Sequence, residues 1–274
     1  MLLGRLSRSV LMAFLAASFS FCSPDKEAVS SSPTPAPIPA PGKALQRLRV
    51  RVVSTRPHDT GAYTQGLVWD HGTLYESAGL YEQSTLRQVD PATGAVKRQL
   101  KVPDKYFAEG LALVGDRLIQ ITWQEGTVFF YRAADFGKIR EVSYTGEGWG
   151  LCYDGKRLIM SDGSDRLTFR NPDTFEAYSV VHVKMDGAPV DQLNELECVD
   201  GAVYANVWMT QDILRIDPET GEVTAVIDAS GLLTPADYQA GAEVLNGIAW
   251  MPETKTFLIT GKRWPLMFEV EFVP

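Results

Sequence analysis

The chain has 274 residues, 45% of them hydrophobic and 22% charged, which is the composition of a globular protein able to bury a full core. Its formal net charge of −8 repels phosphate backbones, so nucleic acid is not expected as a partner. The three histidines and three cysteines lack the spacing of a zinc site, and no metal site is predicted.

Residues 1–22 have the layout of a secretory signal. Arg5 and Arg8 precede an apolar run, and small residues follow. Two processing routes are open, namely cleavage after Ser20 and lipidation of Cys22. The sequence therefore predicts an exported protein that is periplasmic, extracellular or held at a membrane as a lipoprotein through Cys22.

Residues 23–44 are predicted to be a linker, because the stretch SSSPTPAPIPAPG cannot bury apolar surface and its prolines favour extended polyproline geometry. The single catalytic domain is then expected over residues 45–274. Its two cysteines are Cys152 and Cys198, and a structural disulfide between them is allowed but not required.

One phrase recurs five times in this domain. The copies are YTQGLVW from Tyr63, FAEGLAL from Phe107, EGWGLCY from Glu147, LNELECV from Leu193 and LNGIAW from Leu245. Equivalent positions are separated by 44, 40, 45 and 52 residues, close to the ~40–45 residues of a four-stranded propeller blade. A β-sandwich of many short strands would leave this repetition unexplained.

Each unit continues with a tight turn, a second strand and a third strand that ends in a phrase such as VDPATG, RNPDTF or IDPETG. The fifth unit stops after its third strand, whereas the segment Leu45–Val52 is a lone strand before the first unit. It can supply the missing outer strand and so cover an exposed edge. The prediction is an all-β, five-bladed β-propeller with four-stranded blades, closed by an N-terminal strand.

The first strands of a propeller line its centre, and each second strand returns beside the first. First-strand starts and second-strand ends therefore share one face. Two sets of residues fall there. The first-strand set is Gln65, Glu109, Trp149, Asn194 and Asn246, and the second-strand set is Gly79, Trp123, Gly163, Trp208 and Lys262. Together they predict a small-ligand pocket, mostly apolar with a few placed polar groups.

Each of these residues also has a purely structural interpretation. The three tryptophans could pack between blades. Glu109 could be solvated or form an ion pair with Lys262, and Asn194 and Asn246 could cap turns.

At these positions the sequence resembles the plant-type glutaminyl cyclotransferases. The resemblance spans Thr55 to Val270 and rests on the phrases YTQGL, YFAEGL, TWQEG, GEGWGL, LNELE, YANVW, LNGIA and TGKRWP, in family order. It implies a five-bladed propeller and an aminoacyltransferase that, without a metal, converts the N-terminal glutamine of peptides or proteins to pyroglutamate and releases ammonia. No comparable match to the zinc-dependent animal cyclases is visible.

The resemblance also implies roles for single residues. Glu109 falls on the position of the family's proton-transfer glutamate, and Lys262 and Asn194 on those of the lysine and asparagine that hold the substrate amide. Gln65, Trp123, Trp149 and Trp208 match substrate-contacting positions, and Asn246 joins them by its place on the first strand. Ala108 and Tyr63 look like neutral variations.

No cofactor is expected, and a structural ion such as calcium cannot be read from the sequence. A closed ring is expected to be a monomer. The alternative function is a non-catalytic propeller that binds peptides or glycans, and release of ammonia from a peptide that begins with glutamine separates the two.

Overall fold

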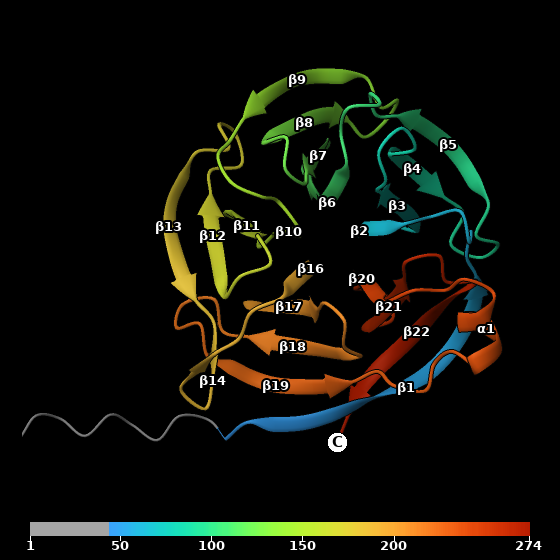
Figure 1. The fold of residues 1–274 in the computed structure, drawn as a ribbon, viewed down its shortest axis with the longest axis vertical. Coiled ribbons are helices and arrows are strands. Elements are labelled where there is room, and N and C mark those ends of the chain that lie inside the picture. The colour runs from blue at the N-terminus through green and yellow to red at the C-terminus, as the bar shows by residue number, and fades with distance from the viewer. Residues whose placement is uncertain (1–43) are drawn as a thin grey trace, which may run out of the picture. The chain divides into compact units, whose positions relative to one another are not determined.

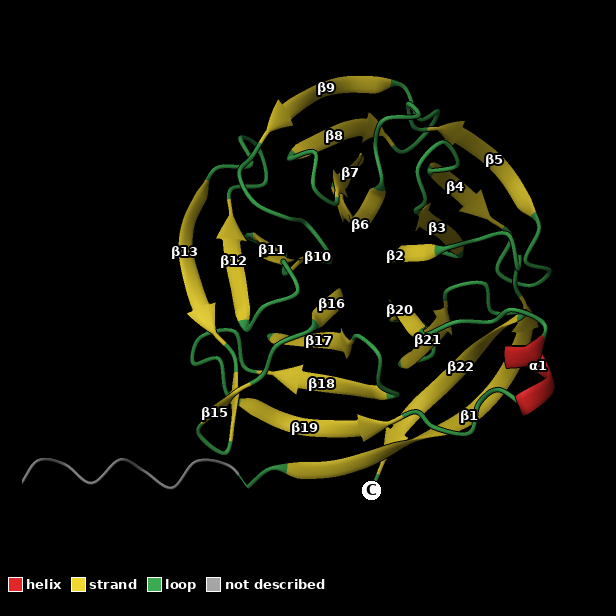
Figure 2. Cartoon of the chain, viewed as in Figure 1, coloured by secondary structure: helices red, strands yellow, loops and turns green. Residues whose placement is uncertain are grey.

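The computed structural model describes residues 44–274. The expectations for the signal and for nearly all of the linker concern residues outside this range. The described part consists of strands, turns and one short helix, α1 (Pro235–Gln239), in the connection between β19 and β20 (Figure 2). The all-β prediction is confirmed. Within this part of the chain, no helix is both long and apolar enough to cross a membrane.

Three antiparallel sheets have four strands each, in sequence order. The first contains β2 (Thr64–Asp70), β3 (Thr73–Ala78), β4 (Thr85–Val89) and β5 (Val96–Lys101). The second contains β6 (Ala108–Val114), β7 (Arg117–Thr122), β8 (Thr127–Arg132) and β9 (Lys138–Ser143). The third contains β10 (Leu151–Tyr153), β11 (Leu158–Ser161), β12 (Arg166–Arg170) and β13 (Ala177–His182). These are the propeller-like blades that the repeated phrase predicts.

A fourth sheet has eight strands. In spatial order they are β16 (Leu193–Val199), β17 (Ala202–Val207), β18 (Asp212–Ile216), β19 (Val223–Asp228), β1 (Gln46–Pro57), β22 (Leu266–Val273), β21 (Thr256–Gly261) and β20 (Leu245–Met251). A separate two-stranded ribbon is formed by β14 (Lys184–Met185) and β15 (Ala188–Pro189).

Strand β1 pairs with strands from two different repeats. It is antiparallel to β22 and, at its beginning, parallel to β19. The strand is longer than the predicted Leu45–Val52 and continues to Pro57, past a register shift between Val52 and Ser54. The extra length matters for the site because it carries the chain directly to His58.

Figure 1 shows the first strand of each repeat innermost, namely β2, β6, β10, β16 and β20. Neighbouring inner strands contact one another all the way round. Glycines permit this close approach, since a Cβ on Gly110 would lie 2.5 Å from the Leu151 nitrogen and one on Gly150 would lie 2.0 Å from the Asn194 carbonyl oxygen. The recurrent glycine of the repeated phrase therefore serves packing.

Glu195 occupies this glycine position in the fourth repeat and is fully buried. Its carboxylate accepts hydrogen bonds from the backbone N–H groups of Leu67, at 3.2 Å, and Ile248, at 2.8 Å. It thereby links β16 to β2 and β20 near the centre.

The hydrophobic core lies between neighbouring sheets. Leu86 of β4, Leu111 of β6 and Phe129 of β8 belong to one cluster, which joins the first two sheets. Burial of each such side chain contributes ~1.5–3 kcal/mol. Cys152 of β10 and Cys198 of β16 form a disulfide that connects two neighbouring sheets covalently. The sequence alone allows this disulfide but does not require it.

Candidate active site

A pocket of about 440 Å³ opens at one end of the inner strands. Its lining residues are Tyr63, Gln65, Phe107, Glu109, Trp123, Trp149, Asn194, Trp208 and Lys262. Seven of the eight side chains selected from the sequence therefore line this one pocket, and the eighth, Asn246, does not.

Strand pairing explains the convergence. Leu193 at the start of β16 pairs with Val207 at the end of β17, so Asn194 and Trp208 emerge at the same end of their sheet. The same register, start against end, joins β6 to β7 and β20 to β21. It places Trp123 beside Glu109 and brings Lys262 to the pocket.

Glu109 supplies the carboxyl group among the residues that line the pocket. Its side chain is 5% exposed, and its Oε1 accepts a hydrogen bond of 3.0 Å from Gln65 Nε2. Burial raises the pKa of the Glu109 carboxyl well above its usual range. The Lys262 ammonium opposes this shift, whereas the charges of Glu125 and Glu147 add to it. Such a carboxyl can both accept and return a proton under mild conditions.

Lys262 supplies the positive charge of the pocket. Burial lowers the pKa of its ammonium, and Glu109 and Glu243 counteract part of that shift. Its Nζ lies 4.8 Å from the centre of the Tyr63 ring, a distance suited to a cation–π contact. Glu109 and Lys262 influence each other's pKa but form no ion pair in the described part of the chain. The pocket thus keeps an acid and a base apart.

Aromatic rings form most of the remaining wall. Phe107 contacts Tyr63 on one side and Trp123 on the other, with ring centroids 6.1 and 5.7 Å apart. Trp149 and Trp208 form a second edge-to-face pair at 5.7 Å. Because Trp208 is 38% exposed and the other two tryptophans are partly exposed, these side chains border the cavity instead of being enclosed between sheets.

The glycines of the second-strand set make room for these rings. A Cβ on Gly79 would lie 2.4 Å from Phe107 Cε1, and one on Gly163 would lie 2.6 Å from the Trp149 ring. Gly79 thus makes room for an aromatic side chain from the next repeat, and Gly163 makes room for one from its own repeat. The other repeats present Trp123, Trp208 and Lys262 at this position.

Asn246 is placed differently from the prediction. It is fully buried, and its Nδ2 donates to Gln65 Oε1 at 3.0 Å and to the Thr64 carbonyl oxygen at 2.9 Å. The amide of Gln65 thus bridges Asn246 and Glu109. Asn246 lies behind the wall and orients Gln65, because the inner strand that carries it turns the side chain toward β2.

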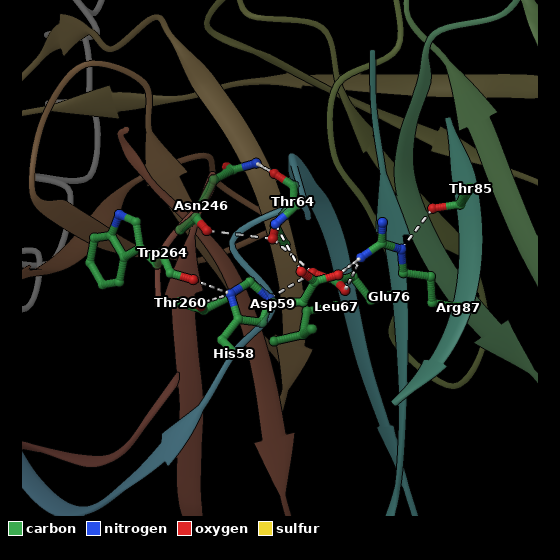
Figure 3. Close-up of polar contacts among 12 residues, drawn as sticks. His58, Asp59, Thr64, Leu67, Glu76, Thr85, Arg87, Asn246, Thr260 and Trp264 are labelled. Atoms are coloured by element: carbon green, nitrogen blue, oxygen red, sulfur yellow. Dashed lines mark hydrogen bonds and ion pairs between the residues drawn. The ribbon is translucent and has the colours of Figure 1, made fainter. Parts of the chain in front are cut away.

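A second polar network lies behind the start of β2 (Figure 3). His58 Nε2 contacts Glu76 Oε1 at 2.9 Å, and Thr64 Oγ1 donates to the same oxygen at 2.8 Å. The other ring nitrogen of His58 contacts the Trp264 carbonyl oxygen at 2.8 Å. This network ties the end of β1 and the connection after Lys262 to the strand that carries Gln65.

Sequence reasoning missed two wall residues, Tyr63 and Phe107. Each stands two positions before a selected residue, Gln65 or Glu109, and side chains two apart on a strand share a face. This two-residue period is the sequence signal that points to Tyr63 and Phe107 as further residues of the pocket wall. The sequence suggests a neutral variation at Tyr63, whereas in the structure its ring contacts both Lys262 and Phe107.

Comparisons with known proteins identify the family of the chain. The family model described as glutamine cyclotransferase matches residues 25–272. The chain is 40% identical over 228 residues to the glutaminyl-peptide cyclotransferase of Arabidopsis thaliana, with 81% of this chain and 71% of that protein covered. The crystal structure of Myxococcus xanthus glutaminyl cyclase is similar with a TM-score of 0.76 and 42% identity, covering 84% of this chain and 98% of that one. The chain therefore belongs to the glutamine cyclotransferase family.

Proposed function

We propose that the protein is a glutaminyl-peptide cyclotransferase, which closes the N-terminal glutamine of peptides or proteins to pyroglutamate and releases ammonia. The observation that carries the proposal is Glu109, a buried carboxyl with a raised pKa that faces a small pocket beside a lysine. Family membership and the names of both relatives support it.

In this reaction the α-amino nitrogen of the substrate attacks its own γ-carbonyl carbon. A new carbon–nitrogen bond closes the ring, and the bond to the amide nitrogen breaks. Glu109 accepts the proton that the attacking amine loses and returns it to the departing nitrogen, which leaves as ammonia. General acid–base catalysis of this kind contributes about 10²- to 10⁴-fold in rate.

Negative charge develops on the carbonyl oxygen during attack. Lys262 and Asn194 have N–H donors in the pocket wall and stabilise that oxyanion, an effect that is largest where water is excluded. Gln65 holds Glu109, and the tryptophans Trp123, Trp149 and Trp208 keep the flexible glutaminyl chain folded so that its ends meet.

The fold belongs to the same proposal. The eight-stranded sheet divides at β1 into two sets of four strands, β16 to β19 and β20 to β22 with β1. With the three separate sheets this makes a five-bladed β-propeller whose ring is closed by β1. The order of contacts among the inner strands supports this count.

The proposed chemistry needs no metal. The pocket offers one carboxyl, one amine, two carboxamides and aromatic rings, whereas catalytic zinc takes three histidine, cysteine or carboxylate ligands.

We also propose that the protein is exported and monomeric, with a lipid anchor at Cys22 as one form of attachment. The signal-like sequence of residues 1–22 supports export, and so does a disulfide between Cys152 and Cys198.

The test is mass spectrometry of a short peptide with N-terminal glutamine, incubated with the full-length protein. We expect loss of one ammonia well above the spontaneous rate, with or without a transition-metal chelator. The same peptide with an acetylated N-terminus is the matched control and should remain unchanged. A protein that binds the free peptide but never releases ammonia is a binding module, whereas activity lost to the chelator and restored by zinc rejects the metal-independent mechanism.

A further inference from the structure

We propose that Glu147 is a positioning residue that joins the two halves of the aromatic pocket wall and thereby sets how the substrate glutamine is held. This inference rests on the proposed function for its kinetic consequences, but its structural core can be measured without turnover.

The geometry centres on one oxygen atom. Glu147 Oε2 accepts a hydrogen bond of 2.8 Å from Trp123 Nε1 and one of 3.0 Å from Trp149 Nε1. Its other oxygen, Oε1, accepts from Gln124 Nε2 at 3.1 Å. An indole nitrogen can only donate, so both rings depend on an acceptor for their orientation.

The position of this contact in the wall gives it importance. Ring-to-ring contacts connect Phe107 with Trp123 on one side and Trp149 with Trp208 on the other. Across residues 44–274, no ring contact links Trp123 to Trp149 directly. The Glu147 carboxylate fills this break.

The break is also a boundary between sheets. Trp123 follows β7 of the second sheet, whereas Trp149 precedes β10 of the third. Glu147 therefore fixes the relative position of side chains from two sheets. Without the carboxylate, each indole would lose an acceptor and could rotate within the partly exposed wall.

The ionised form of Glu147 suits this role. The hydrogen bond from Trp149 lowers the pKa of its carboxyl, burial opposes the shift, and bonds from Gln124 and Trp123 add to it, while the charge of Asp162 opposes it. Glu147 is therefore an anion at neutral pH. Its charge also contributes to the raised pKa of Glu109, together with Glu125 and against Lys262. The two effects of Glu147, orientation and charge, can be separated by substitution.

Two substitutions separate them. Glu147→Ala removes the acceptor and the charge, whereas Glu147→Gln removes the charge but retains an oxygen that can still accept from the indoles. Glu141→Ala is the matched control, because Glu141 is an exposed carboxylate on β9 that is bonded to Lys138. All three are compared with the wild type by the indole N–H signals in ¹H–¹⁵N spectra, assigned through Trp123→Phe and Trp149→Phe.

We expect Glu147→Ala to shift both indole signals and to raise KM for a glutamine-initiated peptide about tenfold, the scale of a lost hydrogen bond to a charged group. Glu147→Gln should change KM less, but it should move the acidic limb of the kcat/KM profile to lower pH, because one negative charge near Glu109 is gone. Glu141→Ala should match the wild type in both measurements.

The proposal is overturned if Glu147→Ala leaves both indole signals and KM unchanged. Should that variant fail to fold, Glu147→Leu decides, because leucine retains much of the side-chain volume but has no acceptor: unshifted indole signals together with an unchanged KM contradict the proposal. Affinity for the product-like pyroglutamyl peptide provides a reading independent of chemistry. If the wild type releases no ammonia, the proposed function fails, yet the indole signals and this affinity still test the role of Glu147.

Discussion

Two glutamates near the same pocket have opposite electrostatic surroundings. Glu109 is buried, receives one neutral hydrogen bond from Gln65 and has neighbouring negative charges, so its pKa is raised. Glu147 accepts three hydrogen bonds on its two oxygens, and its pKa is lowered. Such a separation of pKa values assigns different roles to groups of the same chemical type. One carboxyl can carry a proton, while the other remains an anion that holds the wall.

The proposed proton-transfer role of Glu109 predicts the effect of an isosteric amide. Glu109→Gln retains the size of the side chain but cannot take up a proton at the pH of turnover. We expect kcat to fall by about 10²-fold or more with a smaller change in KM, the pattern of an interaction made in the transition state. Steady-state ammonia release measures both constants.

Asn246→Ala is the control for indirect effects, because Asn246 acts on Glu109 only through Gln65. It should lower kcat less than Glu109→Gln does. Near-normal kcat in Glu109→Gln would mean that the proton travels through solvent or another group.

At the residue scale, the sequence identified side chains whose position follows from strand order alone. Glu109, Asn194 and Lys262 are examples, because a first-strand start and a second-strand end must meet. It could not identify the direction of Asn246, which depends on a hydrogen bond to a strand far away in the sequence. The contact of Glu147 with Trp123 and Trp149 cannot be predicted for the same reason, since nothing in the order of residues indicates that two indoles donate to one oxygen.

At the scale of elements, the start of β2 is held by buried charge. Burial alone would lower the pKa of His58, but the charge and hydrogen bond of Glu76 outweigh it, and the pKa is raised. Burial alone would raise the pKa of Glu76, but His58 and Arg87 outweigh it, and the pKa is lowered. His58, directly after β1, and Glu76 of β3 therefore form an ion pair, and Thr64 at the start of β2 donates a hydrogen bond to the same carboxylate.

This pair predicts a pH-dependent stability. A histidine whose pKa is raised by folding stabilises the fold fully below the unfolded pKa of about 6.5, and this stabilisation is lost as the pH rises through the folded pKa. A glutamate whose pKa is lowered by folding stabilises the fold above the unfolded pKa of about 4.3, and this stabilisation is lost as the pH falls through the folded pKa. The substitution His58→Gln should therefore lower the unfolding free energy by about 3 kcal/mol at about pH 5.5, where the pair is charged. At about pH 9 the loss should be smaller.

Thermal or urea unfolding at the two pH values measures the difference. The control is His182→Gln, because His182 is an exposed histidine bonded to Asp165 at the surface, and it should have little effect at either pH. An equal loss of stability at both pH values in His58→Gln would show that the contact works by packing and not by charge.

For the whole molecule, the repeated phrase was sufficient to predict the four-stranded sheets, because each copy begins an inner strand and every hairpin is local. The N-terminal strand was harder. Its apolar and charged residues predict a strand, but its parallel contact with β19 and its continuation to Pro57 depend on pairing between distant segments. The spacing of Cys152 and Cys198 likewise could not fix a disulfide, since their proximity arises only when β10 and β16 lie in neighbouring sheets.

That disulfide carries a prediction for the molecule as a whole. It joins cysteines 46 residues apart in the sequence, so it restricts the unfolded chain and should stabilise the fold by about 2–4 kcal/mol. In a domain of this size, replacing both residues with serine, Cys152→Ser with Cys198→Ser, should lower Tm by roughly 5–15 °C in calorimetry. A reductant should lower Tm of the wild type by a similar amount and leave the double variant unchanged, which controls for the serine substitutions themselves. If the reductant has no effect on the wild type, and thiol titration of the unfolded protein finds both cysteines free, the two sheets are held together by packing alone.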